Sequence, residues 1–223
     1  MKKITWTMAV VCAALTCGAF MLWQSEVRAQ AASGPKAVIT KVETQSIRSP
    51  QNGSVQGKGE GQSTNQWIQS TALYSTSGGA GRGFDARSSW QDELTVEWFV
   101  LLDPSPRKVK PILLRKTVTY VDVDDDKREH CADVYMRPSF IKRFCGKMFS
   151  ATRDMKVYVR IKAGGQTLAT ETSDKATLAS KWWEAEPPRV DLRDADLMTR
   201  DETPYAAMEY DKFEQIKKPG STR

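Results

Sequence analysis

The sequence predicts an all-β fold, an antiparallel immunoglobulin-like β-sandwich with one short disulfide-linked helix and a C-terminal tail helix. Two observations carry this prediction. Apolar residues recur at every second position in several long runs, which is the period of a half-buried strand. Short polar segments rich in Gly and Pro separate these runs, and strands do not alternate with helices, which disfavours a doubly wound α/β fold.

The first 31 residues are typical of an export signal. A positively charged start precedes an apolar run at residues 4–23, and Ala29-Gln30-Ala31 is a small-x-small site of the kind that signal peptidase cleaves. Cleavage is expected after Ala31 or after Ala29. The alternative is an uncleaved anchor, because about 20 apolar residues can span a bilayer. We therefore expect a protein exported to the periplasm, outer membrane or cell surface, with a membrane contact only if the signal is retained.

The rest of the chain divides into three parts. Residues 32–66 are predicted to form a mobile N-terminal region with a first strand at residues 37–47. The polar, glycine-rich stretch before residue 66 is typical of a long surface loop. Residues 67–188 are predicted to form the sandwich core, and residues 189–223 a C-terminal tail.

Four segments of the core show strand patterns. Residues 67–75 alternate, and residues 94–102 are apolar on one face throughout and on both faces at one end, which predicts a central strand. Residues 112–123 are rich in β-branched side chains. Residues 156–173 read as two strands joined at Gly164-Gly165, which predicts a β-hairpin.

Two helices are expected. Residues 138–146 carry an apolar stripe between an early proline and a final glycine, and a second helix should run from Thr203-Pro204 to about residue 217. Cys131 and Cys145 are an even pair in an oxidising compartment, so we expect a disulfide that fixes the first helix to the preceding strand. A metal site is the rival interpretation, but only His130 is available nearby as a further ligand.

No catalytic residues are recognisable, and we expect a protein that is not an enzyme and needs no cofactor. His130 is the only histidine, so every Ser-His-Asp or Cys-His scheme would require it. Its neighbour Cys131 would point to the opposite face of a strand. Paired carboxylates such as Glu184 and Glu186 keep a small envelope hydrolase open as an alternative.

A weak calcium motif is the one metal candidate. Asp122, Asp124 and Asp126 have the spacing of the first three ligands of a calcium loop. The pattern then fails, because Lys127 occupies the position of the turn-forming glycine. A solvated loop at the end of a strand is the simpler interpretation, and no metal is expected.

Aromatic side chains are the candidate binding residues. Trp90, Trp182 and Trp183 lie near predicted strand ends, where they could stack on a sugar ring or anchor a partner protein. The alternative is that they plug the ends of the sandwich. Tyr205, Tyr210 and Phe213 are the corresponding candidates in the tail. The formal net charge of +6 falls to 30 − 26 = +4 without residues 1–31, which is mild, and its charges are interspersed, so no nucleic-acid partner is expected.

The tail carries a family resemblance. Its string Thr203-Pro204-Tyr205-Ala206 through Asp211-Lys212-Phe213-Glu214 resembles one in exported proteins of Akkermansia and related verrucomicrobia. The order of signal, β domain, tryptophan pair and tail is similar to a family from a type IV pilus-associated gene cluster. The resemblance implies a structural or interaction role beside a pilus system, and it implies no catalytic residues. Because a prepilin signal is lacking, an accessory role is expected rather than that of the major subunit.

These observations lead to one functional expectation and two alternatives. We expect a non-enzymatic interaction or assembly module that docks on envelope or pilus-associated proteins, or on its own copies, through sheet edges, aromatic residues or the tail. The first alternative is a carbohydrate-binding module that uses exposed tryptophans. The second is the small envelope hydrolase.

Overall fold

The computed structural model describes residues 34–50, 66–79, 81–82, 89–103, 110–126, 128–146, 149–208, 210–218 and 220. The predicted export signal and most of the predicted loop before residue 66 lie outside these ranges. Within the described part of the chain, no helix is long and apolar enough to cross a membrane.

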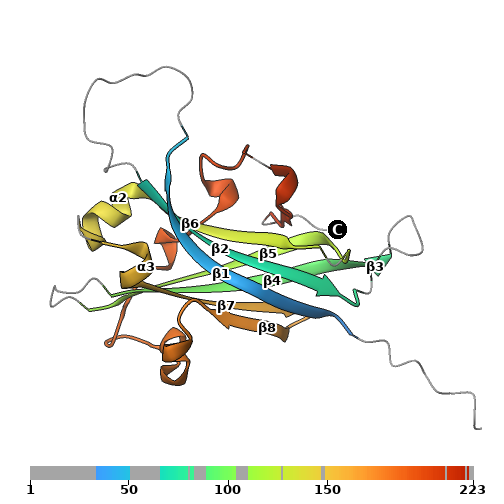
Figure 1. Cartoon of the computed structure of the whole chain (residues 1–223), viewed down its shortest axis with the longest axis horizontal. Helices are drawn as coiled ribbons and strands as arrows, with labels where there is room; N and C mark the ends of the chain where they lie inside the picture. The colour runs from blue at the N-terminus through green and yellow to red at the C-terminus, as the bar shows by residue number, and fades with distance from the viewer. Residues whose placement is uncertain are drawn as a thin grey trace, which may run out of the picture. The chain divides into compact units, whose positions relative to one another are not determined.

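The strands form two sheets, as expected for an all-β protein (Figure 1). The smaller sheet has the order β1-β2-β6-β10: β1(Lys36–Arg48), β2(Gln66–Ser77), β6(His130–Met136), β10(Met198–Thr199). The larger sheet has the order β11-β5-β4-β7-β8: β11(Gln215–Ile216), β5(Ile112–Asp124), β4(Ser89–Leu102), β7(Met155–Ala163), β8(Gln166–Thr172). Two short strands complete the larger sheet: β3(Gly81–Arg82) beside β4, and β9(Asp191–Leu192) parallel to β5.

The main core lies between the two sheets and follows the period of two that the sequence shows. On β4, every second residue from Leu94 to Leu102 is completely buried, with Trp98 as its largest side chain. Tyr74 of β2 and Val134 of β6 belong to the same core cluster. Alternation places these side chains on one face because successive residues of a strand point to opposite faces. Strand β4 pairs with β5 on one side and β7 on the other, so the prediction of a central strand is confirmed.

The predicted β-hairpin is present between β7 and β8. Gly164 and Gly165 form its turn with φ angles of 55° and 81°. Two consecutive residues with positive φ give the type of turn whose twist matches that of the flanking strands, and glycine adopts this conformation without a Cβ clash.

The short helix predicted at residues 138–146 is also present. It consists of α2(Pro138–Phe140) and a π-helical turn, η1(Ile141–Cys145), and Gly146 follows with a φ of 76°. Phe140 and Cys145 face the main core. A second short helix, α3(Ala151–Asp154), precedes β7.

The predicted tail helix at residues 203–217 is not formed. The chain after β8 instead contains 3₁₀ turns, namely η2(Lys175–Ser180), η3(Trp182–Glu184), η4(Asp194–Asp196), η5(Arg200–Glu202) and η6(Tyr210–Lys212). Between these turns the tail alternates between the sheets: β9 pairs with β5, β10 with β6, Phe213 with Cys131, and β11 again with β5. The tail therefore joins the β5 edge of one sheet to the β6 edge of the other (Figure 1). These pairings outweigh the local preference for a helix.

The predicted disulfide is not formed either, since both thiols are free. Cys131 lies at the start of β6, on the face opposite to Ala132 and Val134, and pairs with the tail. Cys145 follows the other end of β6 and belongs to the core between the sheets. Five residues of extended strand, about 16 Å, separate Cys131 from that end. The two thiols therefore lie on different faces and at different ends of one strand.

Candidate functional site

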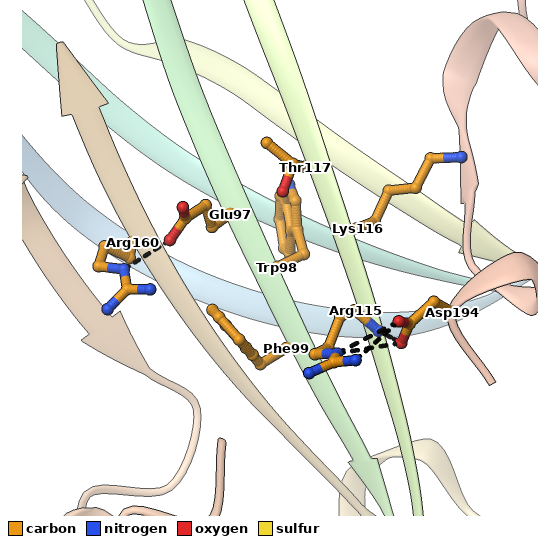
Figure 2. Close-up of a pocket in the computed structure, with 8 residues that line it drawn as sticks. All are labelled: Glu97, Trp98, Phe99, Arg115, Lys116, Thr117, Arg160 and Asp194. Carbon is orange, nitrogen blue, oxygen red and sulfur yellow. Dashed lines mark hydrogen bonds and ion pairs between the residues drawn. The ribbon is translucent and has the colours of Figure 1, made fainter. Parts of the chain in front are cut away.

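One hollow of about 300 Å³ lies on the outer face of the larger sheet (Figure 2). It is lined by residues of three adjacent strands and of the tail: Glu97, Trp98, Phe99, Arg115, Lys116, Thr117, Arg160 and Asp194. The strand register places Phe99 opposite Arg115, and Glu97 opposite Arg160. Figure 2 shows the Phe99 ring between the two guanidinium groups.

The charged side chains of the hollow are ion-paired. Glu97 accepts hydrogen bonds from Arg160 Nε and Lys162 Nζ, both at 2.6 Å. Burial by itself would raise the pKa of Glu97, but these two cations and their hydrogen bonds outweigh it and lower that pKa. Arg115 Nη2 donates to Asp194 at 3.0 Å, and this hydrogen bond raises the pKa of Arg115.

The side chains that line the hollow offer contacts to a polar ligand. Arg160 lies over the Phe99 ring, with 5.5 Å between its Cζ atom and the ring centroid. Its Nε atom is used by Glu97. An aromatic floor with a guanidinium above it offers stacking and hydrogen-bond donors to a ligand. The described residues that line the hollow include neither cysteine nor histidine.

The tryptophan pair predicted to bind a partner or sugar is buried beside this hollow. Trp183 stacks on Tyr158, and Trp182 meets Trp183 edge to face with 5.8 Å between ring centroids. Together with Leu113 and Val190 they form a second core cluster on the outer face of the larger sheet. They cover this face rather than present their rings to solvent. Trp90 is half-buried and pairs with Gly81 of β3.

The aromatic residues predicted in the tail also make internal contacts. Tyr205 stacks on Tyr135 with 5.2 Å between centroids and meets Trp67 edge to face at 5.7 Å. Its hydroxyl donates to the carbonyl oxygen of Arg48 at 2.7 Å. Phe213 lies under the guanidinium of Arg200 at 3.6 Å. The side chain of Tyr210 is outside the described residues.

A buried polar network, which sequence reasoning missed, anchors the tail to β6. Arg200 Nη1 donates to the Asp133 carboxylate at 3.0 Å and to the Tyr135 hydroxyl at 2.9 Å. The Tyr135 hydroxyl in turn donates to the Asp133 carboxylate, and Gln69 Nε2 donates to the same carboxylate at 3.2 Å. Burial outweighs these contacts and raises the pKa of Asp133. The only signal in the sequence was a carboxylate in the middle of an apolar strand.

His130 connects the other end of β6 to the tail. Its Nδ1 atom lies 2.7 Å from Glu214 Oε1, and its Nε2 atom lies 3.6 Å from Asp126 Oδ1. The ring stacks on Tyr74 with 5.4 Å between centroids. The hydrogen bond to Glu214 outweighs burial and raises the pKa of His130.

The weak calcium motif is not assembled. Among the described residues, no group of three or more His, Cys, Asp or Glu side chains could hold a metal ion. Asp122 and Asp124 belong to β5, whereas Asp126 follows it and pairs with Arg128 at 3.1 Å. The acidic run therefore forms the end of a strand and its following turn.

The fold and these networks define a two-sheet, mostly antiparallel β protein whose C-terminal segment is built into the domain. One protein-family model matches residues 28–220, and the chain belongs to that family. A crystal structure of a protein from Akkermansia muciniphila is similar, with a TM-score of 0.65 and 21% identity over 83% of this chain and 94% of the other. This likeness establishes the fold. No curated protein matches the chain.

Proposed function

We propose that this protein is a non-enzymatic interaction or assembly module of the bacterial envelope, associated with a type IV pilus-like system. Its two sheets would form an immunoglobulin-like sandwich that docks on envelope or pilus-associated proteins. The export signal expected at residues 1–31 and the resemblance of the tail support this location.

The observation that carries the proposal is the edge of β1, which lies close to β8 and α3 but forms no strand pairing with either. This strand has 13 residues, pairs with β2 along nearly its whole length, and has no hydrogen-bonded strand on its other side within the described part of the chain. An edge of this length can add a strand from another chain. The opposite side of the domain is different, because the tail pairs with both β5 and β6 there.

The side chains of β1 favour the same role. Val38 is 60% exposed, the largest exposed fraction among the large hydrophobic residues described. Four of the other candidates for docking, Trp182, Trp183, Tyr205 and Phe213, make internal contacts.

The proposal is tested by placing a charge on this edge. Val38→Lys should reduce capture of partner proteins from envelope extract at least tenfold, because a lysine on an edge strand opposes the addition of another strand. Partners would be identified by mass spectrometry and their binding repeated with purified proteins. Leu178→Lys is the matched control, since Leu178 is also exposed but lies in η2. Equal binding by both variants and the wild type would contradict the role of β1.

The hollow over Phe99 supports carbohydrate binding as a second candidate function. A sugar could stack on Phe99 while Arg160 donates hydrogen bonds to its hydroxyl or carboxylate groups. A glycan array with the wild type and Phe99→Ala would decide this candidate, because binding through the hollow requires the ring. The same array should show no effect of Trp182→Phe, since that indole packs in the second core cluster.

A further inference from the structure

The contact between β6 and the last part of the tail includes one ionisable pair, His130 and Glu214, beside the pairing of Phe213 with Cys131. His130 is 7% exposed and lies between two carboxylates, Glu214 on its Nδ1 side and Asp126 on its Nε2 side. Neutral imidazole carries one N–H, whereas the protonated ring carries two. Only the protonated ring can therefore direct an N–H toward both carboxylates at once.

The other groups around the ring reinforce this requirement. Asp124, at the end of β5, adds a third negative charge that favours the protonated ring. Tyr74 of β2 covers one face of the ring, and burial together with the charge of Glu214 raises the pKa of this phenol. On β6 itself, burial raises the pKa of the adjacent Cys131 thiol. The ring thus faces a neutral phenol and acidic groups, while the adjacent thiol is neutral and points to the other face of β6.

Two cations lie in the same region, Arg128 and Lys212. Arg128 is strongly exposed and pairs with the other oxygen of Asp126 at 3.1 Å. Lys212 precedes Phe213 in the tail and lowers the pKa of Cys131 slightly through its charge, against the larger effect of burial. Glu129, the residue before His130, accepts a hydrogen bond from Thr40 of β1 at 2.9 Å. The carboxylates therefore outnumber the cations around the imidazole.

Glu214 lies at a critical position in the tail. The residue before it, Phe213, pairs with Cys131 of β6, and the two residues after it form β11 on β5. Lys217 continues this pairing, with its N–H donating to the carbonyl oxygen of Thr119 at 2.7 Å. The side chain of Glu214 is thus the charged group at the point where the tail crosses from one sheet to the other.

We propose that His130 and Glu214 form a proton-dependent latch that fastens residues 213–217 across the β5 and β6 edges. With the ring protonated, the ion pair holds Glu214 and the short strand β11 stays on β5. Loss of the proton removes the positive charge and leaves a neutral ring between carboxylates. Strand β11 has only two residues, and apart from this ion pair the segment is held by the Phe213 contacts with Cys131 and Arg200 and by the pairing with β5.

The direction of the pH effect follows from linkage. The pKa of His130 is raised in the folded protein relative to an unfolded value of about 6.5. The latch therefore contributes its full stability below pH 6.5 and loses it as the pH rises through the folded pKa. The segment 213–217 should be tightly held in mildly acidic solution and should open more often at alkaline pH.

Hydrogen exchange of the tag-free protein tests the latch. Protection factors of the amides at residues 213–217, corrected for the intrinsic pH dependence of exchange, should fall at least about fivefold between pH 6.0 and pH 8.5. The amides of β4 should not change. Because His130 is the only histidine, its NMR titration is unambiguous and should give a pKa above 6.5.

Three variants complete the design. Glu214→Gln should lower the pKa of His130 and abolish the pH dependence of protection, and Asp126→Asn should lower that pKa by less. Lys217→Gln is the matched control on the same segment, because it removes the exposed ion pair with Glu93. This variant should keep the fall in protection between pH 6.0 and pH 8.5. A His130 pKa at or below 6.5, or equal protection of residues 213–217 at both pH values, would overturn the proposal.

Discussion

Trp183 lies face to face with Tyr158, with 4.0 Å between ring centroids and 4° between ring planes. Tyr158 is on β7, and Trp183 belongs to the turn segment that follows β8. The pair covers the outer face of the larger sheet where β4 is also apolar, at Phe99 and Leu101. This contact explains why the central strand carries apolar side chains on both faces at one end.

Trp183→Ala should therefore destabilise the domain rather than impair binding of a ligand. Loss of a buried aromatic side chain costs about 3 kcal/mol of the free energy of unfolding. Trp183→Phe should cost about 1 kcal/mol, since a smaller ring can still stack on Tyr158. Urea denaturation followed by tryptophan fluorescence measures both values. A folded Trp183→Ala variant of wild-type stability that has lost glycan binding would contradict this structural role.

The pair Arg200–Asp133 should behave as a buried ion pair. Replacing Arg200 with Met leaves a buried carboxylate without its cation and should cost about 3 kcal/mol. The double variant Arg200→Met/Asp133→Asn should lose less than the sum of the single losses, because it leaves no charge uncompensated. A double-mutant cycle from urea denaturation gives the coupling energy. Strictly additive losses would show that the two groups do not interact.

We expect the contribution of Glu97 to the free energy of unfolding to be lost in acid. Burial opposes its charge, but Lys162 and Arg160 lower its pKa below the ordinary value of about 4.3. Its contribution is therefore present above pH 4.3 and is lost as the pH falls through the folded pKa. Glu97→Gln should be about 1 kcal/mol less stable than the wild type at pH 7 and equally stable near pH 2. Thermal denaturation across this range measures the difference.

A second carboxylate serves as the control for this experiment. Glu43 on β1 is about half exposed and pairs with Lys41. Glu43→Gln should change the stability by less than about 0.5 kcal/mol at pH 7, as is usual for a surface ion pair. If both substitutions have the same effect, the stabilisation does not come from the cluster around Glu97.

The cysteines should behave as two independent thiols. Cys145 is buried in the core and burial raises its pKa to about 12, so it should not react with a thiol reagent at pH 8 until the protein unfolds. Cys131 is half-buried and should react slowly in the native state. Peptide mapping under non-reducing conditions should recover both thiols free. A peptide containing Cys131 linked to Cys145 would contradict the geometry of β6.

Sequence and structure agree best where the contacts are local. The period of two in β4 and β5 follows from alternation along a strand, which residues 94–102 and 112–123 already display. The turn at Gly164-Gly165 and the helix that ends at Gly146 depend on glycines at defined positions. For these elements the sequence signal and the physical cause lie within a few residues of each other.

The disulfide prediction illustrates where this reasoning fails. The expected oxidising compartment and the even number of cysteines favoured a bridge. Neither observation says where Cys145 lies relative to β6. A short sequence separation does not bring two side chains to the same face of a sheet. The structure separates them because Cys131 contacts the tail while Cys145 enters the core.

The sequence by itself determined that this chain builds antiparallel strands, a hairpin and a short helix, because hydrophobic period and turn residues act locally. Only the tertiary structure decided the path of the tail. Its short strands take their hydrogen bonds from β5 and β6, and its anchors Arg200 and Glu214 find partners 67 and 84 residues away along the chain. Such contacts depend on which faces and edges the fold brings together, and no local pattern encodes them.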